Sequence, residues 1–211
     1  MRDNDLVWLR NLMEEHCIER GDFILSSGRP AKYYYDGKSG TLNPRAAKVI
    51  GQLLLPLIRE TGAEAVGGMS IGADPIAMAV ALASLDDGGP EIPAFIVRPS
   101  PKEHGKRDQV SASFASDGKA LLSPGRKVAI VDDVITTGGS VKGAITAVEN
   151  LGCTVTLVLV LVERHERGGE KLSAEGYNFT SLFYTDADGN LRIREDVPQH
   201  AAGLSGERLL R

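Results

Sequence analysis

Two adjacent carboxylates, Asp132 and Asp133, follow an apolar run and precede a stretch of hydroxyl residues and glycines. The apolar residues 128–131 predict a buried strand, and in a parallel sheet the carboxyl ends of the strands face the ligand crevice. Carboxylates placed there suit ribose hydroxyls or Mg²⁺. Residues 136–140 lead into a predicted helix, whose free backbone N–H groups and dipole suit a phosphate. Together these features indicate a sugar phosphate as ligand, against the alternative of an acidic turn with a helix cap.

A second group of charged residues lies in the connector between Arg98 and Arg126, which is long for a loop inside a compact domain. Connectors of this length are usually functional lids or disordered segments. The charged side chains near its start are Lys102, His104, Lys106 and Arg107. We expect a lid that brings cations to a bound phosphate, and a solvated charged loop is the alternative.

The elements that must position these residues follow from the hydrophobic pattern. Asn43 as N-cap and Pro44 as first helical residue predict a helix that Gly62 ends. A helix over 5–20 and two extended runs, 22–28 and 32–38, precede it. After it we expect strand 63–70, helix 74–85, strand 93–98, strand 127–133, helix 138–152, strand 154–163 and strand 178–184.

Apolar strands that alternate with helices predict an α/β fold, with a mostly parallel central sheet covered by helices on both faces. We expect one domain over residues 1–185. Residues 186–211 show weak periodicity and are expected to form a surface or flexible tail.

Composition narrows the classes of function. The formal net charge of −4 over 211 residues argues against a nucleic-acid binder, and no apolar run is long enough to span a membrane. Cys17 and Cys153 show no metal-ligand spacing and are expected to be reduced and buried. The expected location is the cytoplasm.

The stretch 128–140 resembles the motif with which type I phosphoribosyltransferases bind phosphoribosyl pyrophosphate (PRPP). Four further segments, 23–38, 67–77, 97–105 and 161–169, resemble the orotate phosphoribosyltransferases of that family. The resemblance implies the type I fold, with a small N-terminal hood formed largely by residues 1–40 and a long mobile loop. It implies an enzyme of pyrimidine (UMP) biosynthesis, a glycosyltransferase that joins PRPP and orotate into orotidine 5′-monophosphate and pyrophosphate.

The same resemblance implies roles for individual residues. The residues implied to bind PRPP are Asp132, Asp133, Thr136, Thr137, Gly138, Gly139, Ser140, Ser70, Gly72 and Ala73. Those implied to bind orotate are Ser27, Gly28, Tyr34, Tyr35, Thr136 and Arg164. Those implied to act in catalysis are Lys102, His104, Arg98, Asp132 and Asp133. From the residues alone, Arg164 could equally form a surface ion pair.

The resemblance also implies Mg²⁺, held mainly by substrate with Asp132 or Asp133 in reach, and a homodimer in which loop 99–110 reaches the neighbouring site. Ser26, Gly72 and Pro99 stand where some relatives have lysine, so fewer fixed cations surround the pyrophosphate. The alternatives are a phosphoribosyltransferase for another base and a non-catalytic PRPP sensor on the same fold.

Overall fold

The computed structural model describes residues 2–24, 30–100, 109–114, 118 and 120–195. Its helices are α1 (Arg2–His16), α2 (Lys38–Thr41), α3 (Pro44–Glu60), α4 (Ala73–Asp86), α5 (Gly139–Glu149) and α6 (Gly168–Ala174). Its strands are β1 (Ile18–Ile24), β2 (Pro30–Tyr35), β3 (Ala65–Met69), β4 (Ala94–Val97), β5 (Val110–Ala112), β6 (Lys127–Ile135), β7 (Thr154–Glu163), β8 (Phe179–Thr185) and β9 (Leu191–Ile193).

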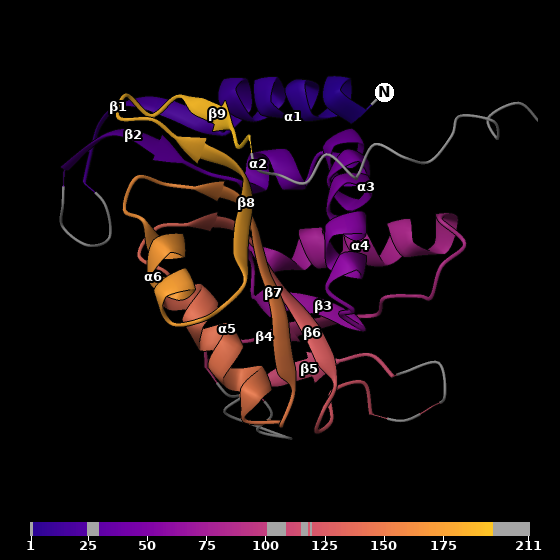
Figure 1. Cartoon of the computed structure of the whole chain (residues 1–211). Coiled ribbons are helices and arrows are strands. Elements are labelled where there is room, and N and C mark those ends of the chain that lie inside the picture. The colour runs from indigo at the N-terminus through magenta and orange to yellow at the C-terminus, as the bar shows by residue number, and fades with distance from the viewer. Residues whose placement is uncertain (1, 25–29, 101–108, 115–117, 119, 196–211) are drawn as a thin grey trace, which may run out of the picture.

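The central sheet has seven strands in the order β5-β4-β3-β6-β7-β8-β9. The five inner strands are parallel, and the edge strands β5 and β9 each pair antiparallel to their neighbour. Figure 1 shows α5 and α6 on one side of this sheet and α3 and α4 on the other. The predicted α/β architecture with a mostly parallel sheet is confirmed.

Alternation along β6 explains why both faces of the sheet are covered. Val128 and Ile130 pack with α5 and α6 in one hydrophobic cluster, while Ala129 and Val131 pack with α3 and α4 in the other. Successive strand residues point to opposite faces, so a strand that is apolar at every position must be buried on both. The same pattern in β7 makes these two strands the centre of the fold.

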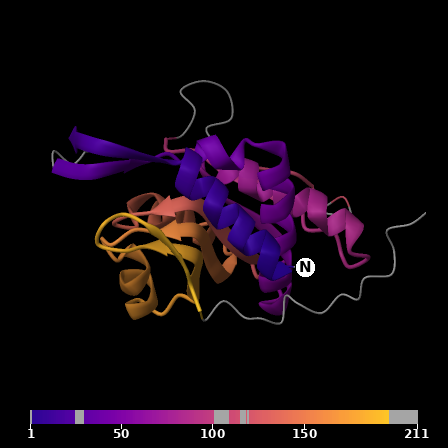
Figure 2. The same ribbon diagram turned by 90° about the horizontal axis from the view of Figure 1, so that it is seen from above.

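The N-terminal part forms a hood beside one end of the sheet. β1 and β2 make an antiparallel hairpin, and α1 lies next to α3 and β9 (Figures 1 and 2). The helix predicted over 5–20 instead occupies Arg2–His16, because residues from Ile18 onward pair with β2. Cys17 lies at the junction and is buried, as expected.

Two predicted irregular segments contain strands. The connector after Arg98 holds β5, which pairs with β4. Residues 186–195, expected to begin a surface tail, instead form a tight turn and β9, whose Leu191 is only 2% exposed. The tail prediction is wrong for these residues because β9 completes the sheet and packs against α1; residues 196–211 lie outside the described part.

Candidate active site

The two carboxylates lie inside β6, not after it. Asp132 and Val134 still pair with β7, so the strand continues to Ile135, two residues beyond the predicted strand 127–133. Asp132 and Asp133 are each only 6% exposed, and the backbone N–H of Asp133 donates to Asp132 Oδ1 at 3.0 Å. The sheet itself therefore holds the acid pair at the carboxyl end of the strand.

Two glycines from other elements form the walls around the acid pair. A Cβ at Gly72 would lie 2.5 Å from Asp132 Oδ1 and 2.6 Å from Asp133 Oδ1. A Cβ at Gly37, just before α2, would lie 2.6 Å from Asp133 Oδ2. These separations are far below carbon–oxygen contact distance, so both positions need glycine.

Burial raises the pKa of both carboxyl groups of this pair. Burial, and next the charge of Asp133, raise the pKa of Asp132 from 3.8 to about 8. The pKa of Asp133 is also raised by burial, but the positive charge of Lys38 acts in the opposite direction. Lys38 in turn forms an ion pair with Asp36 at 2.7 Å. The ligand-free site therefore favours one shared proton over two full negative charges.

The predicted phosphate loop follows the acid pair directly. Gly138 has φ 90°, a left-handed conformation that suits glycine, and serves as the N-cap of α5. Thr137, Gly139 and Ser140 are exposed, and Thr136 is half-buried. No side chain in the described part of the chain caps this helix end, so its first N–H groups are suited to binding an anion.

The loop between β3 and α4 reaches the acid pair from the neighbouring strand. It contains Ser70, whose hydroxyl donates to Asp74 Oδ2 at 2.7 Å. α4 begins at Ala73 with Gly72 as N-cap, slightly before the predicted start at Asp74. The structure thus places Ser70, Gly72 and Ala73 at the start of α4, with Gly72 directly against the acid pair.

Arg98 stands at the end of β4, one strand further from the acid pair. Its Nη1 donates to Ser111 Oγ on β5 at 2.7 Å, and its carbonyl accepts from Gln109 Nε2 at 3.1 Å. These contacts tie Arg98 to the antiparallel edge of the sheet. Residues Ser27, Gly28, Lys102 and His104 lie outside the described part of the chain.

Arg164 is the first residue after β7, and β7 pairs with β6, the strand that carries the acid pair. Its backbone N–H donates to the carbonyl of Ile135 at 3.0 Å. Its side chain is buried, and Nε and Nη2 find no hydrogen-bond partner among the described residues. Glu166 Oε1 lies 3.3 Å from Nη2, close enough for an ion pair but without hydrogen-bond geometry. Nε and Nη2 are thus buried donors that make no hydrogen bond to a described residue.

Sequence reasoning missed the aromatic residue that contacts this arginine. The Arg164 guanidinium lies 4.8 Å from the ring centroid of Tyr33, which is 4% exposed. Tyr34 is 45% exposed and faces Phe23, whereas Tyr35 is buried on the side that Tyr33 shares. Tyr34 and Tyr35 therefore do not line one space. The period of two along β2 was the signal that could have identified Tyr33.

The phosphate loop and the turn after Arg164 touch. A Cβ at Gly168 would lie 3.0 Å from the backbone nitrogen of Gly138. The acid pair, the phosphate loop and Arg164 consequently occupy one edge of the sheet, across two adjacent parallel strands about 5 Å apart. Among the described residues no cluster of three or more His, Cys, Asp or Glu side chains could hold a metal ion. The acid pair still offers hard oxygen ligands of the kind that Mg²⁺ takes.

Comparisons with known proteins agree with this geometry. A family model described as a phosphoribosyl transferase domain matches residues 43–180. Orotate phosphoribosyltransferase of Rhodopirellula baltica is 41% identical over 85% of this chain and 92% of its own, and that of Aquifex aeolicus is 39% identical over 83% and 92%. Within the described helices, none is long and apolar enough to cross a membrane.

Solved structures extend the similarity. Mycobacterium tuberculosis orotate phosphoribosyltransferase in complex with PRPP superposes with a TM-score of 0.66 at 32% identity, covering 84% of this chain and 94% of that one. The same enzyme in complex with Fe(III) dicitrate gives a TM-score of 0.70 at 34% identity with the same coverage. Adenine phosphoribosyltransferase of Leishmania donovani, at 19% identity and a TM-score of 0.59, shares the fold.

Proposed function

The chain belongs to the orotate phosphoribosyltransferases of the phosphoribosyl transferase family, and on that premise we propose how its described residues carry out the reaction. The enzyme transfers the phosphoribosyl group of PRPP to orotate and yields orotidine 5′-monophosphate and pyrophosphate. The observation that carries the choice of orotate is Arg164. Its buried Nε and Nη2 make no hydrogen bond to a described residue, although Glu166 Oε1 lies 3.3 Å from Nη2, and this guanidinium edge is the one proposed to bind a carboxylate by two parallel hydrogen bonds.

The acid pair binds the ribose. Ionised Asp132 and Asp133 accept hydrogen bonds from the 2′- and 3′-hydroxyls, and the phosphate loop from Thr136 to Ser140 binds the 5′-phosphate through its N–H and hydroxyl groups. Gly72 and Gly37 keep the carboxylates in place. The sugar is thereby fixed between β6 and the first turn of α5.

The chemical step displaces pyrophosphate from an anomeric carbon and passes through an oxocarbenium-like state. N1 of orotate bonds to C1′ as the bond to pyrophosphate breaks, and the N1 proton passes to the departing pyrophosphate or to water. Because the attacked carbon is cationic in character, N1 needs no strong base, and the protein's contribution is positioning and charge stabilisation. Backbone amides from Ser70 to Ala73 lie where the pyrophosphate leaves, and Arg98 stands at the end of the neighbouring strand. Lys102 and His104 are proposed to supply further positive charge from the 99–110 loop.

Magnesium fits this donor set. Mg²⁺ would be held mainly by pyrophosphate and ribose oxygens, with Asp132 or Asp133 as the protein ligand, and when bound it neutralises charge on the leaving group. Orotate itself contacts Arg164, with Thr136 and the hood residues Ser27, Gly28 and Tyr35 assigned to the same pocket, whereas Tyr34 lies on the other face of β2 against Phe23.

We also propose a homodimer. Met78, Leu82 and Leu85 form an exposed apolar stripe along α4, and exposed Ile71 continues it into the pyrophosphate loop. A second copy packed on this stripe would bury it and bring its own 99–110 loop near the site. The buried free thiols of Cys17 and Cys153 support a reducing compartment, the cytoplasm.

A base-specificity assay tests the function. Purified protein with PRPP and Mg²⁺ is mixed with orotate, uracil, hypoxanthine or adenine, and loss of orotate absorbance is followed beside product formation from the other bases. We expect turnover of orotate alone. Turnover of another base without orotate, or binding of PRPP without any turnover, would contradict the proposal.

A further inference from the structure

Tyr33 is held between Arg164 and a turn from the far end of the chain. The guanidinium lies on its ring, as described above, and a Cβ at Gly189 would lie 2.6 Å from the ring atom Cε1. The Tyr33 hydroxyl donates to Thr185 Oγ1 at 3.2 Å and lies 3.2 Å from His165 Nδ1. The ring is therefore fixed at its face, its edge and its hydroxyl.

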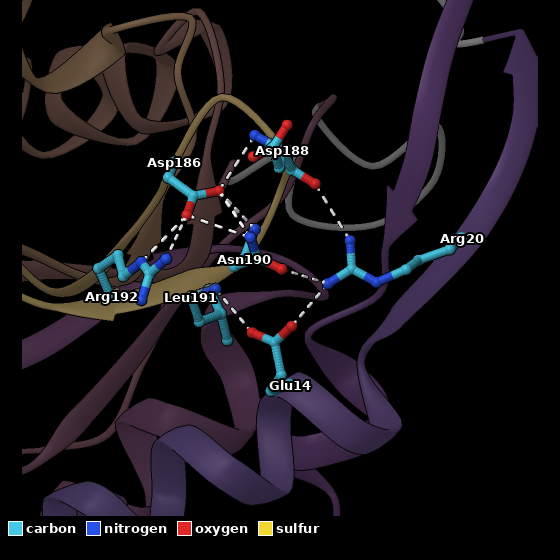
Figure 3. A network of polar contacts seen from close by, with 7 residues as sticks. All are labelled: Glu14, Arg20, Asp186, Asp188, Asn190, Leu191 and Arg192. Atoms are coloured by element: carbon cyan, nitrogen blue, oxygen red, sulfur yellow. Dashed lines mark hydrogen bonds and ion pairs between the residues drawn. The ribbon is translucent and has the colours of Figure 1, made fainter.

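The turn that carries Gly189 is internally rigid. The Asp186 carboxylate accepts hydrogen bonds from the N–H of Asn190 at 2.9 Å and of Asp188 at 3.1 Å (Figure 3). The Asp186 carbonyl accepts a further hydrogen bond from the N–H of Gly189. Arg192 adds an ion pair at 2.8 Å. The hydrogen bond from the Asn190 N–H is the main reason that the pKa of Asp186 is lowered to about 2. The carboxylate thus stays ionised, and the turn stays organised, at any working pH.

The same turn is bound to the hood. Arg20 of β1 donates to the Asp188 carbonyl at 3.1 Å and to Asn190 Oδ1 at 2.8 Å. Glu14 of α1 accepts from Arg20 at 2.7 Å and from the N–H of Leu191 at 2.6 Å. Figure 3 shows these contacts joining α1, β1 and the β8–β9 turn. Hood and turn therefore hold Tyr33 as one unit.

Arg164 needs such support because nothing else described fixes its free edge. A long side chain loses much rotamer freedom when it binds a ligand, and prior ordering by packing reduces that loss. Of its described contacts, the Tyr33 ring is the apolar surface against the guanidinium, and Glu166 is the charged one. Tyr33 thus orders the arginine before the ligand arrives.

We propose that Tyr33 is a positioning residue, pressed onto Arg164 by the 186–190 turn, and that this clamp sets the affinity of the site for the carboxylate of its pyrimidine ligand. The inference rests on the proposed function. It assigns a role in the reaction to the β8–β9 turn, which touches none of the reacting groups.

Two nucleotides that differ in one carboxylate separate positioning from folding. Orotidine 5′-monophosphate carries the carboxylate and uridine 5′-monophosphate lacks it, so calorimetric Kd values for both report on Arg164 directly. For Tyr33→Leu, which removes the ring, we expect roughly five- to thirty-fold weaker binding of orotidine monophosphate. Binding of uridine monophosphate should change by less than about twofold. Tyr33→Phe keeps the ring and should stay within about threefold of the parent for both nucleotides.

A pair of glycines provides the matched test of the turn. Gly189 has φ 81° and touches Tyr33, whereas Gly176 has φ 94° and no atom within 4 Å of its Cβ position. Alanine strains the backbone at both sites. We expect Gly189→Ala to lower the preference for orotidine over uridine monophosphate as Tyr33→Leu does, and Gly176→Ala to leave that preference unchanged.

The outcomes are distinct. A folded Tyr33→Leu that keeps the parental preference would overturn the inference, as would equal losses for both nucleotides. If Gly189→Ala does not fold, the comparison of Tyr33→Leu with Tyr33→Phe still tests the inference. If the parent protein shows no turnover of orotate, the proposed function itself fails; if the parent turns over orotate and Tyr33→Leu keeps its preference, only the clamp is wrong.

Discussion

At the carboxyl end of β6, two carboxylates share a buried space, whereas at the end of neighbouring β7 one buried arginine lies against a tyrosine ring. Both places remove charge from water, which is costly. The acid pair can lower its cost by keeping a proton, as its raised pKa values show. Arginine cannot give up its proton, so Arg164 must be stabilised by Tyr33 and Glu166 until a ligand arrives.

This difference predicts how the acid pair and the arginine site respond to substitutions and to pH. The acid pair consists of adjacent residues on one strand. Its binding of PRPP should therefore depend on pH and on the space around the two carboxylates. The arginine site is assembled from the hood, β7 and the β8–β9 turn. Its binding of orotate should therefore depend on how well these elements pack around Arg164. The following variants are ordered from the largest expected effect to the smallest.

Removing one carboxylate should have the largest effect. For Asp132→Asn we expect kcat/KM for PRPP to fall about 100-fold, because a charged hydrogen bond to ribose is lost. The melting temperature of the ligand-free protein should equal the parent's at low pH and exceed it as pH rises, because the parent alone must keep a buried proton up to about pH 8 and above that carry two negative charges. Steady-state kinetics and calorimetry measure both, with exposed Asp86→Asn as control. If Asp132→Asn lost its stability but kept its activity per folded molecule, Asp132 would be needed for folding and not for binding PRPP, and the prediction would be wrong.

Filling the space beside the acids should come next. For Gly72→Ala we expect a rise of about tenfold in KM for PRPP, because the new Cβ displaces both carboxylates. Gly143→Ala is the control, since a Cβ there meets only the flexible end of Met69 at 3.0 Å. Equal KM values in the two variants would show that the glycine wall does not position the acids.

Stability should depend on pH through Asp132. In the unfolded chain this carboxyl loses its proton near its ordinary pKa of 3.8, whereas in the folded protein burial keeps the proton up to about pH 8. Between these values only the folded state holds the proton, so the group's contribution to the free energy of unfolding is full at low pH and falls as pH rises. Thermal unfolding of ligand-free protein from about pH 5 to pH 8 should show this decline, and Asp132→Asn should flatten it. If the melting temperatures of the parent and Asp132→Asn changed equally with pH, Asp132 would not hold a proton in the folded protein.

Removing the neighbouring cation should have the smallest effect. Lys38 lowers the pKa of Asp133, so Lys38→Met should raise that pKa and shift the pH profile of KM for PRPP toward higher pH. Lys32→Met is the matched control, because Lys32 is an exposed hood lysine paired with Asp22. A profile that moves equally in both variants would indicate a general surface-charge effect.

The same comparison explains what the sequence could predict. The acid pair and the phosphate loop are contiguous, so apolar run, carboxylates and glycines were recognisable without any tertiary contact. The parallel sheet followed from uniformly apolar strands such as β7. Arg164 was assigned from the resemblance of segment 161–169 to the family, since its place after a strand left a surface ion pair equally open. Its partner Tyr33 lies 131 positions away and carries no local signal except the period of two in β2.

The missed elements share a physical cause. β5 and β9 have three residues each, and α2 has four, which is too short for a hydrophobic period. β9 is stable because Glu14 and α1 cover it, a contact between opposite ends of the chain. The Asp188-Gly189 pair before it was a hairpin signal that could have revealed the strand. The glycine wall around the acids was likewise invisible, since only the fold brings Gly37 and Gly72 to Asp133.

The most direct test of the account is the KM for each substrate in Asp132→Asn and in Arg164→Lys. We expect Asp132→Asn to raise mainly the KM for PRPP and Arg164→Lys to raise mainly the KM for orotate, because lysine cannot offer the paired N–H groups. If both variants raise the same KM, the two halves of the crevice do not bind separate parts of the reaction, and the account is wrong.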